Sequence, residues 1–185
     1  MGDKERIYGV YNKSVLEKKV YLNIVEVGNN VKHVLEMKLK DVVEGKCISE
    51  GFVRPNSLRI LTFSSGLIQG DKIEFVTVFE CDVCHPVEGQ LIECTTKAIA
   101  KAGIHAVKTV NDVTSLHIFI AKDHHVQEST YFNEIKENMN IVVKVIGIRY
   151  ELNDPHICII AKLGKFTNEN EDTGARKIKI KKSAK

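Results

Sequence analysis

The chain has 185 residues, of which 43% are hydrophobic and 28% charged, with twelve glycines and three prolines. These values are typical of a globular protein and exclude a disordered or collagen-like chain. The net charge of +3 is unevenly placed: residues 176–185 carry six basic residues and no acid, residues 168–175 carry three acids, and residues 1–167 are neutral. A neutral body with a basic end does not indicate a protein whose whole surface binds nucleic acid.

The sequence carries no pattern typical of a membrane or secreted protein. Its longest apolar run, residues 157–161, has five residues, whereas a membrane-spanning helix needs about 20. The first residues lead into no apolar stretch of the kind that a signal peptide has. Five cysteines without a dense framework indicate reduced thiols. We therefore expect an intracellular protein, in the nucleus or the cytoplasm.

The first half of the chain predicts a small α+β unit. Alternating apolar residues over Lys19–Gly28 predict a strand, and Asn29 or Asn30 then caps an amphipathic helix that ends at Gly45. One helix on a mostly antiparallel sheet is the expected arrangement. The further candidate strands are Lys46–Val53, Ser57–Phe63 and Lys72–Val83.

After Pro86 the pattern becomes almost purely β. Five short candidate strands in about 75 residues are typical of an all-β OB-type barrel. Residues 168–185 have too few apolar side chains to pack, so we expect a disordered basic C-terminal tail there. The candidate strands are Gln90–Lys97, Gly103–Thr109, Ser115–Ala121, Asn140–Tyr150 and His156–Lys162, with a long loop at Asp123–Asn138.

The spacing Cys81-x-x-Cys84-His85 matches half of a zinc site and the attachment motif of c-type haem. Residues three apart in a strand point to opposite faces, so the two cysteines are expected to be small apolar residues at a strand end. A zinc site completed by Cys94 or His85 remains an alternative. The pair His124–His125 is expected in a solvated loop.

No nucleotide-binding, metalloprotease, esterase or dinucleotide motif is present, so we expect no catalytic residues and no cofactor. The barrel does carry cations near aromatic or imidazole rings, the combination with which OB barrels bind single strands. An ordinary solvated face, with Phe119 in the core, is the alternative. The RNA-binding candidates are Lys97, Lys101, His105, Lys108, Phe119 and Lys122.

Several segments, in order, resemble one family: the stalk subunit of multi-subunit DNA-directed RNA polymerases, which archaeal polymerases contain and which is the seventh subunit of eukaryotic polymerase II. The resemblance covers residues 20–163. The segments are Leu39–Cys47 (helix, then Glu-Gly and a strand), Gly66–Asp71 (tip loop), Phe75–Phe79 with Cys84–Ile92 (domain junction), Ala102–Ala106 (S1-type strand), and Val143–Ile148 with Ile157–Lys162 (closing strands).

The resemblance implies an N-terminal tip domain at 1–84, an S1-like OB barrel at 85–167 and the tail at 168–185. It implies a non-catalytic subunit that docks on the largest polymerase subunits near the clamp and places the barrel near the RNA exit path, in weak contact with nascent RNA and with no membrane. A partner like the fourth polymerase subunit would bind between the two units. The docking residues would be exposed loop residues: Gly51, Phe52, Val53, Arg54, Pro55, Gly66, Leu67, Ile68, Gly70 and Asp71.

Three departures stand out: the S1-type aromatic residue is absent, the tail is rich in lysine, and the loop at Asp123–Asn138 is long. They lead us to expect a polymerase of a large DNA virus, acting in a viral factory or virion. Two other classes remain open. One is a free-standing S1-type RNA-binding protein acting in translation or RNA decay, and the other is a metal-dependent enzyme using Cys81, Cys84 and His85.

Overall fold

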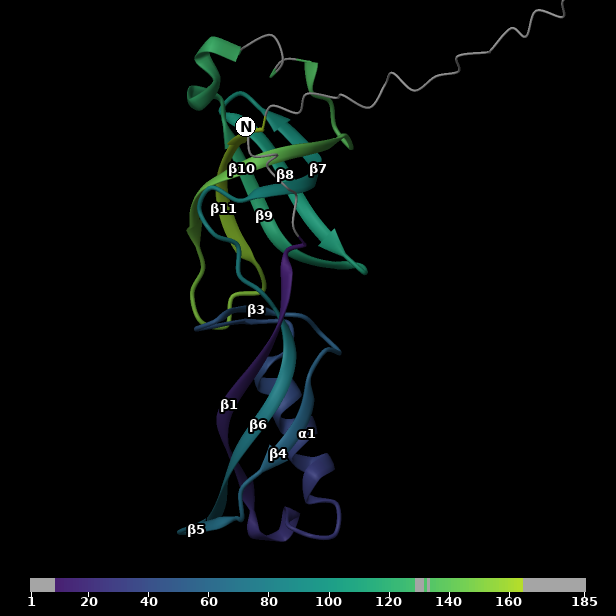
Figure 1. Cartoon of the computed structure of the whole chain (residues 1–185), viewed down its shortest axis with the longest axis vertical. Helices are drawn as coiled ribbons and strands as arrows, with labels where there is room; N and C mark the ends of the chain where they lie inside the picture. Colours follow the sequence, from purple (N-terminus) through teal and green to yellow (C-terminus); the bar gives the residue numbers. More distant parts are fainter. Residues whose placement is uncertain (1–8, 129–131, 133, 165–185) are drawn as a thin grey trace, which may run out of the picture.

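The structure, a computed structural model, describes residues 9–128, 132 and 134–164. Two parts are stacked along the long axis of the molecule (Figure 1): a barrel at one end, and a sheet carrying one helix at the other. None of the helices in the described residues is long and apolar enough to span a membrane.

The sheet of the first part is built on two long strands. β1 (Tyr11–Asn23) pairs antiparallel with β6 (Lys72–Cys84) over the whole length of both. The other strands pair, directly or in turn, with the opposite edge of β6, so none of the strands in the described residues lies on the outer side of β1. They are β2 (Cys47–Ile48), β3 (Gly51–Val53), β4 (Arg59–Phe63) and β5 (Leu67–Gln69).

The helix α1 (Val31–Val43) covers one face of this sheet and follows a short 3₁₀ turn, η1 (Ile24–Glu26). Leu35, Leu39 and Val43 recur every four residues and are fully buried, as expected for the apolar stripe of an amphipathic helix. They pack in a cluster with Phe75 and Phe79 of β6. This cluster is the core of the first part.

The second part is a closed barrel of five strands in the order β10-β11-β9-β8-β7. β11 runs parallel to β9, and the other neighbours are antiparallel. This five-stranded, mixed, closed arrangement is OB-like. The strands are β7 (Leu91–Ala100), β8 (Gly103–Val110), β9 (Val113–Ala121), β10 (Asn140–Arg149) and β11 (Ile157–Leu163).

A short 3₁₀ element, η2 (Lys122–Glu128), follows β9 at a place where a loop was expected. His124 is exposed, as expected, but His125 is buried. The Nε2 atom of His125 accepts the Leu163 N–H at 2.9 Å, and its Nδ1 atom lies 2.9 Å from the Ala121 carbonyl oxygen. The expectation of a solvated His125 is therefore wrong, because this imidazole links η2 to β9 and β11.

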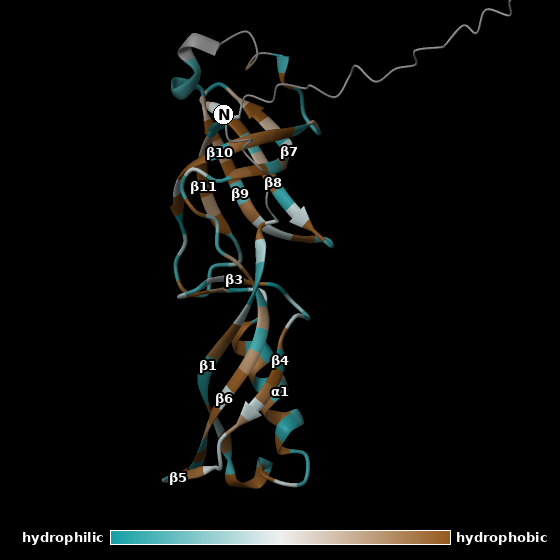
Figure 2. Cartoon of the chain, viewed as in Figure 1, coloured by the Kyte–Doolittle hydropathy of each residue, from teal (hydrophilic) through white to brown (hydrophobic). Residues whose placement is uncertain are grey.

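The two parts are joined by more than the covalent chain. The Cys47 N–H donates to the Asp154 carbonyl and the Asn153 N–H to the Cys47 carbonyl, each at 2.8 Å, so β2 is bonded to the loop between β10 and β11. The apolar cluster of the barrel includes Phe52 and Cys84 of the sheet. Figure 2 shows apolar residues along the strands of both parts, interspersed with hydrophilic ones.

The predicted fold class is confirmed: an α+β part precedes an OB-like barrel. Two of the predicted strands in the first part differ. β1 begins eight residues before the predicted Lys19 and ends at Asn23, where η1 follows, instead of continuing to Gly28. The predicted strand Lys46–Val53 is divided into β2 and β3, which pair with each other. β5 was not predicted at all. The boundary at residues 84 and 85 stays a prediction, and the predicted tail at 168–185 lies outside the described residues.

Candidate docking and nucleic-acid surfaces

The end of the sheet farthest from the barrel exposes apolar side chains. In β5, Leu67 is 58% exposed and Ile68 is 73% exposed. The end of β1 and the strand β5 both pair with the start of β6. Ile24 and Val25 directly follow this end of β1. These four residues form the distal apolar surface. Sequence reasoning missed Ile24 and Val25 as surface residues, because it placed them inside the predicted strand Lys19–Gly28, whereas the structure places them in η1.

The loop at this end has glycines where side chains would not fit. A Cβ on Gly66 would lie 2.5 Å from a methyl carbon of Ile73 and 2.9 Å from the Phe75 ring. Gly70 has a φ of +65° and lies in the turn that begins β6, a conformation that glycine adopts readily. Asp71 beside it is exposed. The local sequence therefore shapes a tight turn that presents Leu67 and Ile68.

An ionic network stiffens the sheet beside this surface. Glu74 is paired in register with Leu67. Its carboxylate accepts a hydrogen bond from the Tyr21 hydroxyl at 2.8 Å and forms an ion pair with the Lys19 ammonium at 2.9 Å. The Lys19 ammonium first, and the Tyr21 hydroxyl second, hold the pKa of Glu74 below its ordinary value. The carboxylate stays charged at neutral pH and ties β1 to β6.

The first predicted docking segment, Gly51–Pro55, lies elsewhere. Phe52 is 2% exposed and Val53 is fully buried, so the expectation that they are exposed is wrong. Gly51 has a φ of +131° and packs against the Cys84 carbonyl oxygen, where a Cβ would clash. Arg54, half-buried next to Pro55, pairs with Asp82. This segment belongs to the joint between the two parts, because β3 adds to the sheet at its barrel end.

Two of the ring-bearing RNA candidates meet on the outside of the barrel. Ile104 and Ala106 of β8 and Ile118 of β9 are buried inside the barrel, so His105 and Phe119 between them point outward. They are paired in register, and their ring centroids lie 4.9 Å apart. Phe119 is half-buried on this outer face and not in the core.

The lysine candidates separate into two places. Lys101 lies in the β7–β8 turn, and the Lys122 N–H donates to the Ala102 carbonyl at 3.0 Å, so both lysines lie at one end of the β8–β9 pair. Lys97 is exposed, at the irregularity opposite His105 in β7. Lys108 is half-buried and lies three residues beyond His105. The structure thus brings together all of the RNA candidates except Lys108.

The same outer face has further rings that sequence reasoning missed. His117, one alternation before Phe119, stacks on His156 with a centroid distance of 3.9 Å and an interplanar angle of 25°. Ile160 of β11 pairs with Phe119 and is 49% exposed. Alternation over Ser115–Ala121 could have identified His117. It could not have identified His156, which lies in the loop before β11. We call the surface made by His105, His117, Phe119, His156 and Ile160 the ring face.

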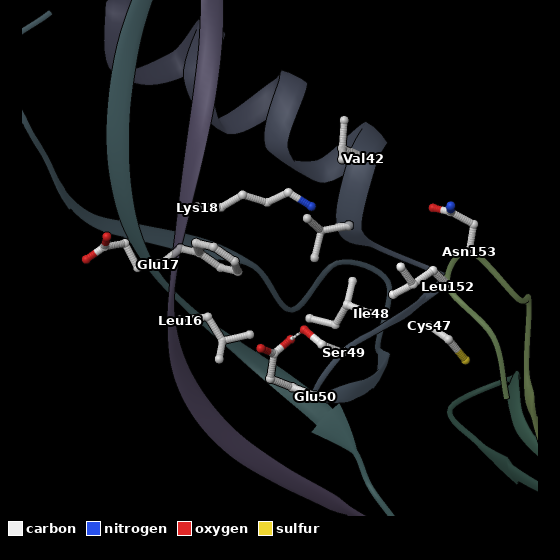
Figure 3. A pocket seen from close by; sticks show the side chains of 12 residues that line it. Leu16, Glu17, Lys18, Val42, Cys47, Ile48, Ser49, Glu50, Leu152 and Asn153 are labelled. Atoms are coloured by element: carbon white, nitrogen blue, oxygen red, sulfur yellow. Dashed lines mark hydrogen bonds between the residues drawn. The ribbon is translucent and has the colours of Figure 1, made fainter. Parts of the chain in front are cut away.

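A cavity of about 400 Å³ lies at the waist, between α1, β1, β2 and the loop that joins β10 to β11. In Figure 3, Lys18 of β1 and Leu152 of the loop reach toward it from opposite sides. Val42 at the end of α1 contributes an apolar wall. A second hollow of about 380 Å³ continues along β1 and α1 past Lys18. Together they form a groove beside the outer edge of β1.

Within the described residues, no three His, Cys, Asp or Glu side chains are grouped so that they could hold a metal ion. Cys81 packs in the core of the first part and Cys84 in the barrel cluster, as expected from their odd spacing. Burial raises the pKa of the Cys81 thiol to about 11 and that of the Cys84 thiol to about 12. His85 is exposed between the two parts. These three residues do not converge on one point.

The chain matches no family model. It is 25% identical over 173 residues to a putative DNA-directed RNA polymerase subunit of Acanthamoeba polyphaga mimivirus, an alignment that covers 88% of this chain and 86% of the relative. It is 28% identical over 155 residues to subunit 7 of DNA-directed RNA polymerase II of Arabidopsis thaliana, covering 74% of this chain and 84% of the relative. Over most of its length, the chain is thus similar to the class of RNA polymerase subunits to which subunit 7 of polymerase II belongs.

Proposed function

We propose that the chain is a non-catalytic stalk subunit of a DNA-directed RNA polymerase, which docks through the distal apolar surface and holds its barrel outward. The observation that carries this proposal is the distal apolar surface on a protein similar to polymerase II subunit 7. Large exposed apolar side chains that gather at one end of a small unit are typical of an interaction site. The similarity to a mimivirus protein supports a viral polymerase as the assembly.

The docking proposal is tested by introducing negatively charged side chains at the distal apolar surface. Leu67→Asp combined with Ile68→Asp should abolish co-purification of the two largest polymerase subunits with the tagged chain from its native source. Val87→Asp is the matched control, because Val87 is 54% exposed and lies in the loop between β6 and β7. Full recovery of the polymerase with the double variant would contradict the docking site. Phe52→Asp is unsuitable, since a charge at a buried site would disturb folding instead.

The ring face is the proposed RNA contact. It combines surfaces for base stacking with nearby cations for phosphates, which give salt-sensitive binding of many sequences. By alternation and register, Lys162 of β11 and Arg149 of β10 lie on the same outer side as Ile160 and Cys158. Lys101 and Lys122 flank the other end of β8 and β9. The candidates Lys97, His105 and Phe119 complete the proposed contact, and the candidate Lys108 lies apart from them on β8.

The groove beside β1 is the proposed site for a partner like the fourth polymerase subunit. This proposal is supported by the outer edge of β1, beside which no other strand of the described residues lies, and by the groove next to it, which touches both parts. Such a strand edge offers backbone hydrogen-bonding groups to another chain. Partners that co-purify with the wild-type chain but not with a Val42→Asp variant would identify it. Recovery of every partner with that variant would contradict this site.

A free-standing RNA-binding protein is the alternative, and the ring face suits that function as well. Co-purification with the tagged chain distinguishes the stalk subunit from the free-standing RNA-binding protein. Recovery of the largest polymerase subunits supports the stalk subunit, whereas recovery of ribosomal or RNA-decay proteins without polymerase supports the alternative.

A further inference from the structure

The ring face carries three imidazoles where RNA-binding barrels commonly present aromatic rings. His105 packs on Phe119, and His117 stacks on His156. Cys158, next to them on β11, pairs in register with His117. Unlike phenyl rings, imidazoles change their charge between about pH 5 and about pH 8. A binding face built from them can therefore stack bases in one protonation state and attract phosphates in the other.

His117 resists protonation in the free protein. The groups packed around His117 desolvate it and lower its pKa, and the neighbouring His156 and His105 lower it further. The ring centroids of His117 and His156 lie 3.9 Å apart, and two imidazolium rings at that distance would repel each other.

Few acids surround this pair. The Glu151 carboxylate faces Arg149 at 3.6 Å, and the Asp154 carboxylate accepts the Glu151 N–H at 2.8 Å. The titratable or charged residues on the strands and the loop packed around the pair are His105 and Lys108 on β8, Cys158 and Lys162 on β11, Lys144 and Arg149 on β10, and Tyr150, Glu151 and Asp154 in the loop.

We infer that His105, His117 and His156 make RNA binding by the ring face strengthen as the pH falls, because bound phosphates promote protonation of the imidazoles. This inference rests on the proposed RNA contact of the same face and concerns its regulation. Its sign follows from linkage: a polyanion binds the protonated form more tightly, so binding takes up protons and affinity rises on acidification. Uptake of one proton multiplies the affinity by at most about ten per pH unit.

The experiment measures binding of a tetramethylrhodamine-labelled oligouridine to the full chain by fluorescence anisotropy, at constant ionic strength from about pH 8 to about pH 5.5. Neither uracil nor this dye titrates in this range, so the pH dependence of binding comes from the protein. We expect the wild-type affinity to rise about tenfold over that interval. The double variant His117→Gln, His156→Gln should lose most of the rise, whereas His33→Gln, a change at an exposed histidine of α1, should keep it.

The possible results separate the pH inference from the proposed RNA contact. Wild-type affinity that does not change with pH overturns the inference and leaves the proposed RNA contact standing. A full rise that persists in the double variant also overturns it, because other groups would then take up the protons. No binding at any pH contradicts both the inference and the RNA contact. Thermal unfolding of each variant at both pH limits checks that the native fold is being compared.

Discussion

The tautomer of His125 follows from its two hydrogen bonds. Its Nε2 atom accepts the Leu163 N–H, so the proton of the neutral ring is on Nδ1 and is donated to the Ala121 carbonyl. The ring is also 4% exposed and packs on Phe132. One imidazole thus satisfies two backbone groups at the junction of β9, η2 and β11, where water has little access.

Replacing His125 with Ala should lower the free energy of unfolding by about 2 to 3 kcal/mol, because a buried N–H and a buried carbonyl would lose their partner. Chemical denaturation measures this change. The control is His124→Ala at the adjacent exposed residue, for which a change within about 0.5 kcal/mol is expected. Equal effects of the two substitutions would show that His125 does not hold η2 in place.

Thiol reactivity gives a second prediction about individual residues. Cys47, Cys81, Cys84 and Cys94 are buried, and burial raises the pKa of the Cys94 thiol to about 12 and that of the Cys47 thiol to about 11. Since the thiolate is the reactive form, these groups should resist Ellman's reagent at about pH 8. Only the exposed Cys158 should react in the native protein, and Cys158→Ser should abolish this signal. Rapid reaction of a second thiol would contradict the burial.

Among the elements, α1 is held on the sheet by its buried apolar stripe more than by its solvent-facing residues. Leu39 is 1% exposed and Met37, two residues earlier on the same helix, is 55% exposed. Leu39→Ala should destabilise the protein by about 2 to 5 kcal/mol, because it removes packed methyl groups and leaves a cavity. Met37→Ala should cost about 0.5 kcal/mol or less. Comparable losses for both, in thermal unfolding, would mean that α1 is not anchored by this face.

The elements that the sequence predicts well are those whose periodicity reflects one-sided burial. The positions of α1 and the five barrel strands follow from helical spacing or from alternation, and so does the outward position of His117. The strand ends are less accurate, since β7 runs three residues past the predicted Lys97, to Ala100. The first half of β1 could not be predicted, because Asn12–Lys19 contains polar residues on both faces. It is a strand because β6 pairs with it throughout. That pairing is a tertiary contact, which local propensity does not contain.

The same limit explains the error at Phe52. A short segment between two turns looks like a loop, and only the approach of the barrel buries it. Leu67 and Ile68 stay exposed because β5 lies at the far end of the sheet, where none of the described residues covers it. Whether a short apolar segment is covered depends on long-range contacts. Sequence reasoning therefore placed both segments on one docking surface, and the structure separates them.

At the scale of the whole molecule, the joint determines whether the barrel is held rigidly on the sheet. Two backbone hydrogen bonds link Cys47 to the loop at Asn153 and Asp154, and the Tyr150 hydroxyl donates to the Ser49 carbonyl at 3.1 Å. Phe52 belongs to the apolar cluster of the barrel. A stalk that holds its outer end in a fixed direction needs such a joint, because a flexible linker would let the ring face take any orientation.

The two parts should therefore unfold together. Phe52→Ala should cost about 3 to 5 kcal/mol and accelerate hydrogen exchange both in α1 and in barrel strands such as β9, because its ring is shared by the two parts. Phe63→Ala is the matched control: this ring, 37% exposed, packs edge-on against Phe75 at the distal end of the sheet. It should accelerate exchange only near β4 and β5. If Phe52→Ala affects one part alone, the joint is a hinge, and the direction of the barrel must then be fixed by a partner.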